Sequence, residues 1–170
     1  MDHLAKIEWI LSKHRETNHK YDEYLPYEFH LKMAVWVFTK YKYLIKPNWE
    51  DKHELATWGH DLIEDTRTSY NDIKSVLGKE VADLIYALTN EKGKNRKERA
   101  NDKYYQGIKE VPGAVFIKLC DRVANVEYSR ISGSSKLYMY KLENEEFLSK
   151  LKCHELDQYK DLINYLNSLF

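Results

Sequence analysis

Apolar residues recur at intervals of three and four along most of the chain, the pattern typical of amphipathic helices. It predicts helices near residues 4–11, 29–44, 47–65, 69–78, 81–88, 113–128, 135–151 and 153–169. The segment AVFIKLC is rich in β-branched and aromatic residues and also suits a strand, but helical spacing continues through Val115, Leu119 and Val123. Six Gly, three Pro and no Asn-Gly or Asp-Gly pair argue against hairpins. We therefore expect an all-α protein.

Composition indicates one compact unit with no preference for a polyanion. The 170 residues are 43% apolar and 14% aromatic, which suffices for one substantial core, so we expect a single domain over residues 1–170. Lys plus Arg and Asp plus Glu both total 27, so no field across the whole chain favours nucleic acid or an anionic membrane. An anionic ligand must then be held by local groups.

Segments for membrane insertion, export or disulfide bonding are not evident. The apolar runs are only a few residues long, far below the roughly 20 needed to cross a bilayer, and the start MDHLAKIEWI has no signal-peptide core. We expect a soluble, cytosolic protein. Cys120 and Cys153 are far apart and outside any CxxC pair, so neither a disulfide framework nor a thiolate zinc site is indicated. No pattern indicates the oligomeric state.

The segment LATWGHDLIEDT places four ionisable residues within positions 60–65 while an apolar stripe is still running. If the helix is continuous, Glu64 lies one turn beyond His60, and Asp65 lies one turn beyond Asp61. A helix end with solvated charges is the simpler interpretation of a His-Asp pair alone. Buried carboxylates placed side by side are costly, however, and a divalent cation would remove that cost.

Two further polar residues interrupt apolar helices elsewhere. His30 lies in FHLKMAVWVF, where a lone histidine is usually a hydrogen-bonded core residue, and Asp121 lies in AVFIKLCDRVANV, where a carboxylate needs a partner. Together with His60 and Asp61 they give the order His, His-Asp, Asp. That order is a recognisable pattern in its own right.

Four segments in order carry a family resemblance: PYEFH (26–30), WGHDLIEDT (58–66), LGKEVADLIYALTNEK (77–92) and IKLCDRVAN (117–125). They resemble the motifs of HD-domain metal-dependent phosphohydrolases, and most closely those of the hydrolase domain of RelA/SpoT-type alarmone enzymes and their small stand-alone relatives. Any one match is weak or moderate evidence, but four in order and at family spacing are strong evidence. The resemblance implies an all-helical HD-domain bundle.

The resemblance also implies a metal site and a pair of catalytic carboxylates. The implied metal ligands are His30, His60, Asp61 and Asp121, and the implied catalytic residues, which act on a metal-activated water, are Glu64 and Asp65. Mn²⁺ is the cation that the family implies. By ligand type alone, this imidazole and carboxylate set also accepts zinc, iron, nickel or cobalt.

Predicted substrate contacts lie close to these ligands. Lys118 and Asn125 share a helical face with Asp121, so Asn125 is a candidate hydrogen-bond donor to a sugar or phosphate. Lys118 suits phosphate neutralisation and, equally well, a side chain that runs past the core to solvent. Tyr27, in PYEFH, is a third predicted contact, and Arg122 is expected to form a structural ion pair.

Two polar features have simpler interpretations. The stretch EKGKNRKERANDK (91–103) is expected to be a solvated loop or helix start, although its cations lie where a polyphosphate could approach. His53 precedes His60 by seven residues and could share its face, but we expect an exposed histidine.

Three functions fit this pattern. The first is a 3′-pyrophosphohydrolase of guanosine 3′,5′-bis(diphosphate), and the second is an HD enzyme acting on another nucleotide, such as a deoxynucleoside monophosphate or NADPH. The third is a catalytically silent nucleotide-binding module, which would not require Glu64 and Asp65 together. Tyr24, Leu31 and Ala124 depart from the alarmone-hydrolase pattern at positions that bear on base and phosphate specificity. In all three cases the partner is a small-molecule nucleotide rather than nucleic acid.

Overall fold

The computed structural model describes residues 1–170, and every regular element in it is a helix. The α-helices are α1 (His3–Glu16), α2 (Glu28–Tyr41), α3 (Glu50–Trp58), α4 (Leu62–Asp65), α5 (Tyr70–Leu77), α6 (Lys79–Leu88), α7 (Arg96–Arg99), α8 (Asp102–Glu110), α9 (Ala114–Ile131), α10 (Lys136–Lys150) and α11 (Lys160–Ser168). Short 3₁₀ turns span Lys42–Leu44, Pro47–Trp49 and Leu156–Tyr159. The all-α prediction is confirmed, including the helical assignment of AVFIKLC within α9.

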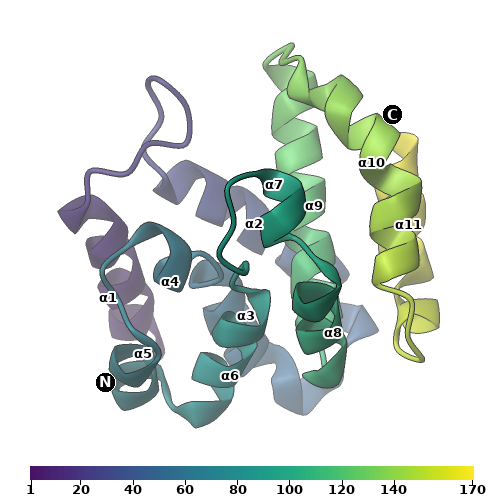
Figure 1. Ribbon diagram of the computed structural model, residues 1–170. Coiled ribbons are helices and arrows are strands. Elements are labelled where there is room, and N and C mark those ends of the chain that lie inside the picture. The colour runs from purple at the N-terminus through teal and green to yellow at the C-terminus, as the bar shows by residue number, and fades with distance from the viewer.

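A single cluster of 34 buried apolar residues forms the core. Helix α2 packs on α9 and α3, and α3 packs on α6, so these four helices surround the centre of the bundle. In Figure 1, α10 and α11 lie on one side of α9, whereas α1 and α5 lie at the other end of the molecule. Phe38 of α2 and Phe116 of α9 meet edge to face, with ring centroids 5.7 Å apart. No helix combines the length and the apolar character needed to span a membrane.

Local sequence signals set several helix ends. Helix α5 begins with the predicted capping box, in which Ser69 N donates to Asp72 Oδ2 at 2.9 Å and Asp72 N donates to Ser69 Oγ at 3.3 Å. It ends at Gly78, whose φ of +95° favours glycine. Within the polar stretch 91–103, Asn95 and Asn101 cap α7 and α8. That stretch is therefore an exposed loop and helix start, as expected.

The predicted helix 47–65 is wrong in its continuity. It is divided into the 3₁₀ turn Pro47–Trp49, α3 and α4, and the chain leaves helical geometry between α3 and α4 at Gly59 and Asp61. An added Cβ on Gly59 would lie 2.7 Å from Ile85 Cδ1, so glycine lets this break approach α6. Adjacent residues of a straight helix face different ways, whereas the break turns His60 and Asp61 toward the same space.

His53 is buried, with 4% of its surface exposed, so the expectation of an exposed histidine is wrong. Its Nδ1 lies 3.0 Å from Trp49 O and its Nε2 lies 3.2 Å from Pro112 O. Its ring also stacks on Trp49 at 5.0 Å between centroids. His53 thereby joins the start of α3 to the turn that begins α9.

Gly113→Ala is expected to destabilise the protein by about 3 kcal/mol, because two costs combine at this position. The residue has φ +79°, and an added Cβ would lie 2.1 Å from His53 Nε2. Gly133→Ala is the matched control: its φ is +66°, but nothing lies within 4 Å of the added Cβ. Urea unfolding of both variants tests this, and equal losses of stability would show that the contact with His53 is unimportant.

Candidate metal centre

Three distant parts of the chain place their ligand-type side chains in one buried spot. His30 comes from α2, His60 from the break between α3 and α4, and Asp121 from α9. The distance from His30 Nε2 is 3.2 Å to His60 Nε2 and 3.3 Å to Asp121 Oδ1, and His60 Nε2 lies 3.6 Å from Asp121 Oδ1. All three residues are buried, and their ligand atoms lie within 4.8 Å of one another. The group is a possible metal site.

Asp61 lies beside these three residues. Its Oδ2 is 3.0 Å from His60 Nε2 and 3.8 Å from His30 Nε2, and it accepts a hydrogen bond from the Tyr27 hydroxyl. All four side chains predicted as ligands therefore converge. Tyr27, predicted as a substrate contact, also touches a candidate ligand through this hydrogen bond.

The spacing and chemistry of these atoms suit one divalent ion. Atoms bound at about 2.1 Å to a single ion lie about 3.0 to 3.4 Å apart, close to the separations between these side chains. His60 Nδ1 lies 2.8 Å from Thr57 O, an acceptor that keeps the proton on Nδ1 and leaves the Nε2 lone pair facing the site. Two imidazoles and two carboxylates without a thiolate favour a transition-metal dication.

The charges in this spot are strongly coupled. Burial raises the pKa of Asp121, but Lys118, His30 and His60 more than offset it and hold that pKa well below its usual range. Burial lowers the pKa of His60, but Asp61 and Asp121 raise it well above the ordinary value. The neighbouring carboxylates thus favour the protonated imidazole, and a dication bound at Nε2 would have to displace that proton.

The two predicted catalytic carboxylates have different surroundings. Both oxygens of Glu64 are held by Asn90, through the backbone N at 2.6 Å and Nδ2 at 2.9 Å. Asp65 Oδ2 lies 3.7 Å from His19 Nδ1. Burial, with Asp61 and Glu64 nearby, raises the pKa of Asp65 to about 7. Sequence reasoning missed Asn90, whose only signal is that it follows Thr89 in a matched motif.

On α9, the predicted substrate contacts are engaged with Asp121. Lys118 Nζ donates to Asp121 Oδ2 at 2.8 Å, and Asn125 Nδ2 donates to Asp121 Oδ1 at 2.6 Å. The shared helical face is therefore real, and both side chains hold the carboxylate. Arg122 points away and pairs with Glu143 at 3.2 Å, which confirms the expected structural ion pair.

A stack of rings that the sequence did not indicate lies next to the site. Tyr27 stacks on His19 at 3.9 Å and on His14 at 5.0 Å between centroids. His14 is 1% exposed, and neither of its ring nitrogens has a hydrogen-bond partner. Burial lowers the pKa of His14 to about 4, so the neutral imidazole is the form that packs here.

His14→Phe is expected to protect the metal-free protein from acid. The folded state binds the His14 proton more weakly than the unfolded chain, so this stabilising contribution is complete above pH 6.5 and is lost as the pH falls toward about 4. The loss reaches about 3 kcal/mol. Urea unfolding at about pH 7.5 and about pH 4.5 measures it, with the exposed His154→Phe as the matched control. Equal acid sensitivity of His14→Phe and the unsubstituted protein would contradict the assignment.

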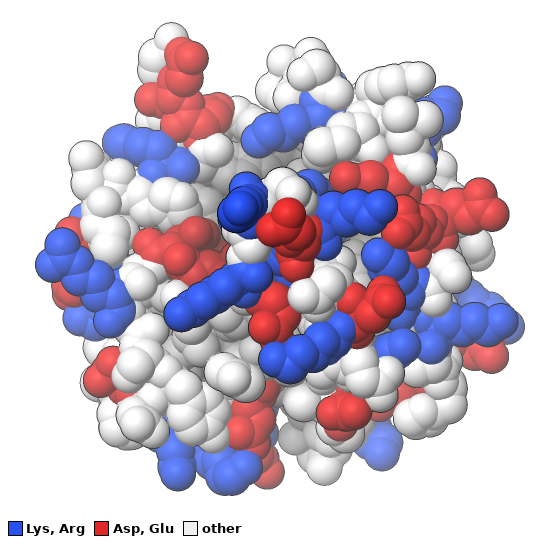
Figure 2. Space-filling model, viewed as in Figure 1, with Lys and Arg blue, Asp and Glu red and all other residues white.

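The surface around the site is mixed in charge. Figure 2 shows Lys and Arg side chains gathered over α7 and its flanking loops, with acidic side chains among them. Arg96 of α7 forms an ion pair with Glu143 of α10 at 3.2 Å, and this pair joins α7 to α10. An open groove of about 870 Å³ between α6 and α8 is lined partly by Thr89, Asn90 and Lys92. Asn90 links this groove to Glu64.

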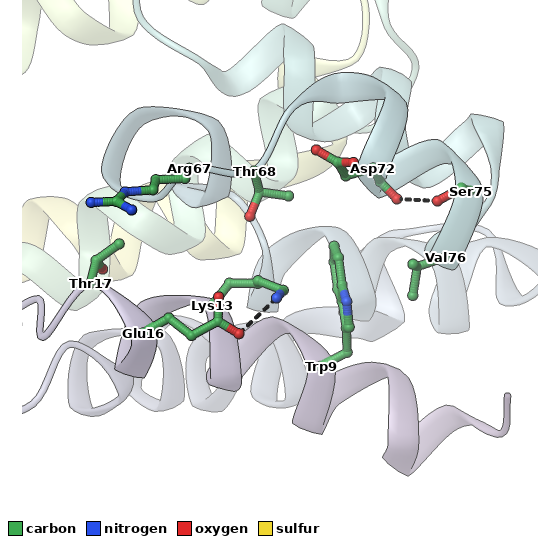
Figure 3. A pocket seen from close by; sticks show the side chains of 9 residues that line it. All are labelled: Trp9, Lys13, Glu16, Thr17, Arg67, Thr68, Asp72, Ser75 and Val76. Carbon is green, nitrogen blue, oxygen red and sulfur yellow. Dashed lines mark hydrogen bonds and ion pairs between the residues drawn. The ribbon is translucent and has the colours of Figure 1, made fainter.

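A separate cavity of about 390 Å³ lies between α1 and α5 (Figure 3). Trp9 forms one wall, and Lys13 pairs with Glu16 at 2.7 Å along the α1 side. None of the predicted site residues lines this cavity. Its cations, Lys13 and Arg67, are matched in number by Glu16 and Asp72, so it is not a dedicated anion pocket.

The fold and the convergent His, His-Asp, Asp set together define an HD-type helical bundle. A solved structure described as a metazoan ortholog of SpoT that hydrolyses ppGpp has this fold: the TM-score is 0.75 at 20% identity, over 99% of this chain and 93% of that one. No family model matches the chain.

Two curated relatives share sequence with the chain, and both are named guanosine-3′,5′-bis(diphosphate) 3′-pyrophosphohydrolase. The Drosophila melanogaster protein is 26% identical over 120 residues, which are 71% of this chain and 65% of the relative. The Aquifex aeolicus protein is 32% identical over 124 residues, which are 71% of this chain and 16% of the relative. The chain thus spans just under two thirds of the first relative and a small part of the second. The predicted resemblance to RelA/SpoT-type hydrolases is confirmed.

Proposed function

We propose that the chain is a metal-dependent phosphohydrolase that removes pyrophosphate from the 3′ position of guanosine 3′,5′-bis(diphosphate). The observation that carries the proposal is the convergence of His30, His60 and Asp121, with Asp61 beside them, in a chain similar to proteins named for that activity. Glu64 and Asp65 lie in the same sequence motif, WGHDLIEDT, as His60 and Asp61. A module that only binds nucleotide would not require this pair.

The proposed cofactor is Mn²⁺. The donor set of two imidazoles and two carboxylates, with no sulfur, suits an ion that keeps open positions for water and phosphate oxygens. When bound, the ion would supply positive charge for the phosphoryl oxygens and make water a better nucleophile near neutral pH. The chain's own residues then have to orient the substrate, accept a proton and hold the ligands in place.

Asp65 is the proposed general base. Its raised pKa of about 7 means that the carboxylate gains the proton affinity that base catalysis near neutral pH needs. Glu64, clamped by Asn90 at 2.6 and 2.9 Å, is the better fixed of the two carboxylates and is proposed to orient the attacking water. Proton acceptance and orientation are thus divided between neighbouring residues.

The proposed substrate contacts are Lys118, Tyr27 and Asn125. The Lys118 ammonium lies 2.8 Å from Asp121 and can also meet a phosphate oxygen, because an ammonium carries three donors. Tyr27 and Asn125 already bond to Asp61 and Asp121, so either would touch substrate only while also holding a candidate ligand. Their contribution to substrate binding would thus be coupled to metal binding.

A second candidate is hydrolysis of another nucleotide, such as a deoxynucleoside monophosphate or NADPH. Tyr24 favours it, because this 81% exposed side chain stands where the alarmone enzymes usually carry glycine, in the segment that leads to Tyr27. A bulky side chain there would change the space available for a base. This difference bears on which nucleotide is accepted and leaves the metal ligands unchanged.

A substrate panel in the presence of Mn²⁺ tests these proposals. Purified protein is incubated with ppGpp, pppGpp, ppApp, NADPH and deoxynucleoside monophosphates, and released phosphate and pyrophosphate are separated. Release of pyrophosphate from ppGpp, lost on chelation and restored by Mn²⁺, is the expected result. Release of phosphate from another nucleotide alone would support the second candidate. Tight binding of one nucleotide with no turnover would overturn both and leave a silent binding module.

A further inference from the structure

Tyr21 reaches the candidate metal centre from the segment between α1 and α2. Its hydroxyl donates to Asn125 Oδ1 at 2.9 Å, and its ring stacks on the imidazole of His30, with centroids 4.8 Å apart and planes 12° from parallel. No motif in the sequence indicates this residue. Tyr21 nevertheless contacts one candidate ligand, His30, directly, and it reaches a second, Asp121, through Asn125.

The segment that carries Tyr21 is held against α9 by a second contact. Asp22 Oδ2 accepts a hydrogen bond from the Tyr128 hydroxyl, and Asp22 Oδ1 accepts from the backbone N of Tyr24 at 2.8 Å and of Leu25 at 2.7 Å. The backbone of Tyr21 donates to Leu25 O at 2.9 Å, which closes the turn. Tyr21 therefore sits on a locally folded segment with its own anchor on the helix that bears Asp121.

The amide of Asn125 links Tyr21 to Asp121. Its Nδ2 donates to Asp121 Oδ1 at 2.6 Å and to Asp121 O at 3.0 Å, while its Oδ1 accepts from Tyr21. A flipped amide would turn its oxygen toward the Asp121 carboxylate, which has no proton to donate. Asp121 thus fixes the orientation of the amide, which leaves Oδ1 to accept from the Tyr21 hydroxyl. The oxygen that Asn125 holds, Asp121 Oδ1, is the one that lies 3.3 Å from His30 Nε2.

We propose that Tyr21 is a positioning residue for the metal centre, acting on Asp121 through Asn125 and on His30 through its ring. The inference rests on the proposed function, because it assumes that these residues hold a metal. Groups that orient metal ligands without touching the metal typically change affinity by about 10- to 100-fold when they are replaced. The hydroxyl of Tyr21, acting through Asn125, affects metal affinity and the orientation of Asp121, whereas its ring acts on His30.

Tyr21→Phe isolates the hydroxyl, because it keeps the ring on His30. Mn²⁺ binding to the full chain, measured by calorimetry, is expected to weaken about tenfold. The visible absorption of Co²⁺-loaded protein at saturation is expected to shift, since it reports ligand geometry and not folding. Tyr128→Phe is the matched control: it removes the other phenolic bond between this segment and α9, which is made to Asp22 and not to Asn125, and should change neither measurement.

A double-mutant cycle distinguishes an effect passed from Tyr21 through Asn125 to Asp121 from a general loosening of the segment that carries Tyr21. Asn125→Ala alone should weaken Mn²⁺ binding at least as much as Tyr21→Phe, and adding Tyr21→Phe to it should have little further effect. Additive losses, unchanged binding in Tyr21→Phe, or equal losses in Tyr128→Phe would each overturn the role of Tyr21 while leaving the metal site intact. No binding of Mn²⁺ or Co²⁺ by the unsubstituted protein would instead overturn the proposed function, and this inference with it.

Discussion

Replacing Asp121 with alanine is expected to abolish metal binding and hydrolysis together. The carboxylate lies 3.3 Å from His30 Nε2 and 3.6 Å from His60 Nε2, so the substitution removes one of the candidate ligands. Loss of a metal that stabilises transition-state charge by several kcal/mol corresponds to at least about a 1,000-fold fall in rate. Metal content after dialysis and the rate of pyrophosphate release measure the two effects.

The same substitution should also destabilise the metal-free protein. Lys118 Nζ, in a side chain that is only 18% exposed, would lose the carboxylate that it meets at 2.8 Å. Asp83→Ala is the matched control, because Asp83 also accepts from a lysine, Lys79, at 2.6 Å, but lies outside the candidate centre. Asp83→Ala should retain metal and activity. Retention of bound metal by Asp121→Ala would refute the assignment of Asp121 as a ligand.

Replacing Asp65 with asparagine is expected to lower turnover by about 100- to 10,000-fold while leaving metal binding nearly unchanged. Asp65 lies outside the group of His30, His60 and Asp121 and, unlike Asp61, forms no ion pair with His30 or His60, so its loss is expected to remove a proton acceptor rather than a ligand. Asparagine has nearly the same shape and cannot take up the proton. Turnover number and Mn²⁺ affinity, measured on the same preparation, distinguish the two roles.

The role of Asp65 as a base also predicts how the rate of hydrolysis depends on pH. A base with a pKa of about 7 is active only when ionised, so the rate should fall about tenfold for each unit below that pKa and level off above it. A bound dication favours the ionised form, so the limb of the loaded enzyme should lie at or below this value. Asp65→Asn should lack the limb. A variant that keeps both the limb and the rate would exclude Asp65 as the base.

Much of the fold could be predicted from the sequence because helix signals are local. Apolar spacing located α5, α6 and α9, and the capping box at Ser69 and Asp72 marked a helix start that the structure confirms. The break at Gly59 was missed because apolar spacing continues on both sides of it, through Leu55 and Leu62. At Gly59 the chain comes close to Ile85 of α6, a distant residue whose position no local pattern reveals.

The candidate site was predictable in its residue types and order, but its contacts were not. The structure brings His30, His60 and Asp121 together as their shared motif order suggested, whereas their roles as ligands stay a prediction until metal binding is measured. Tyr21 and Asn90 were missed because each acts through a partner far away in the sequence, at Asn125 and Glu64.

Residue spacing was enough to establish that this chain is helical, which faces of its helices are apolar, and which carboxylates and histidines stand where burial makes them costly. The burial of His53 and His14, the separation of α3 from α4, and the stacking of Tyr21 on His30 became visible only in the folded chain. The physical reason is that spacing along a helix specifies which side turns inward, whereas the contacts on that side depend on segments packed there from elsewhere in the chain.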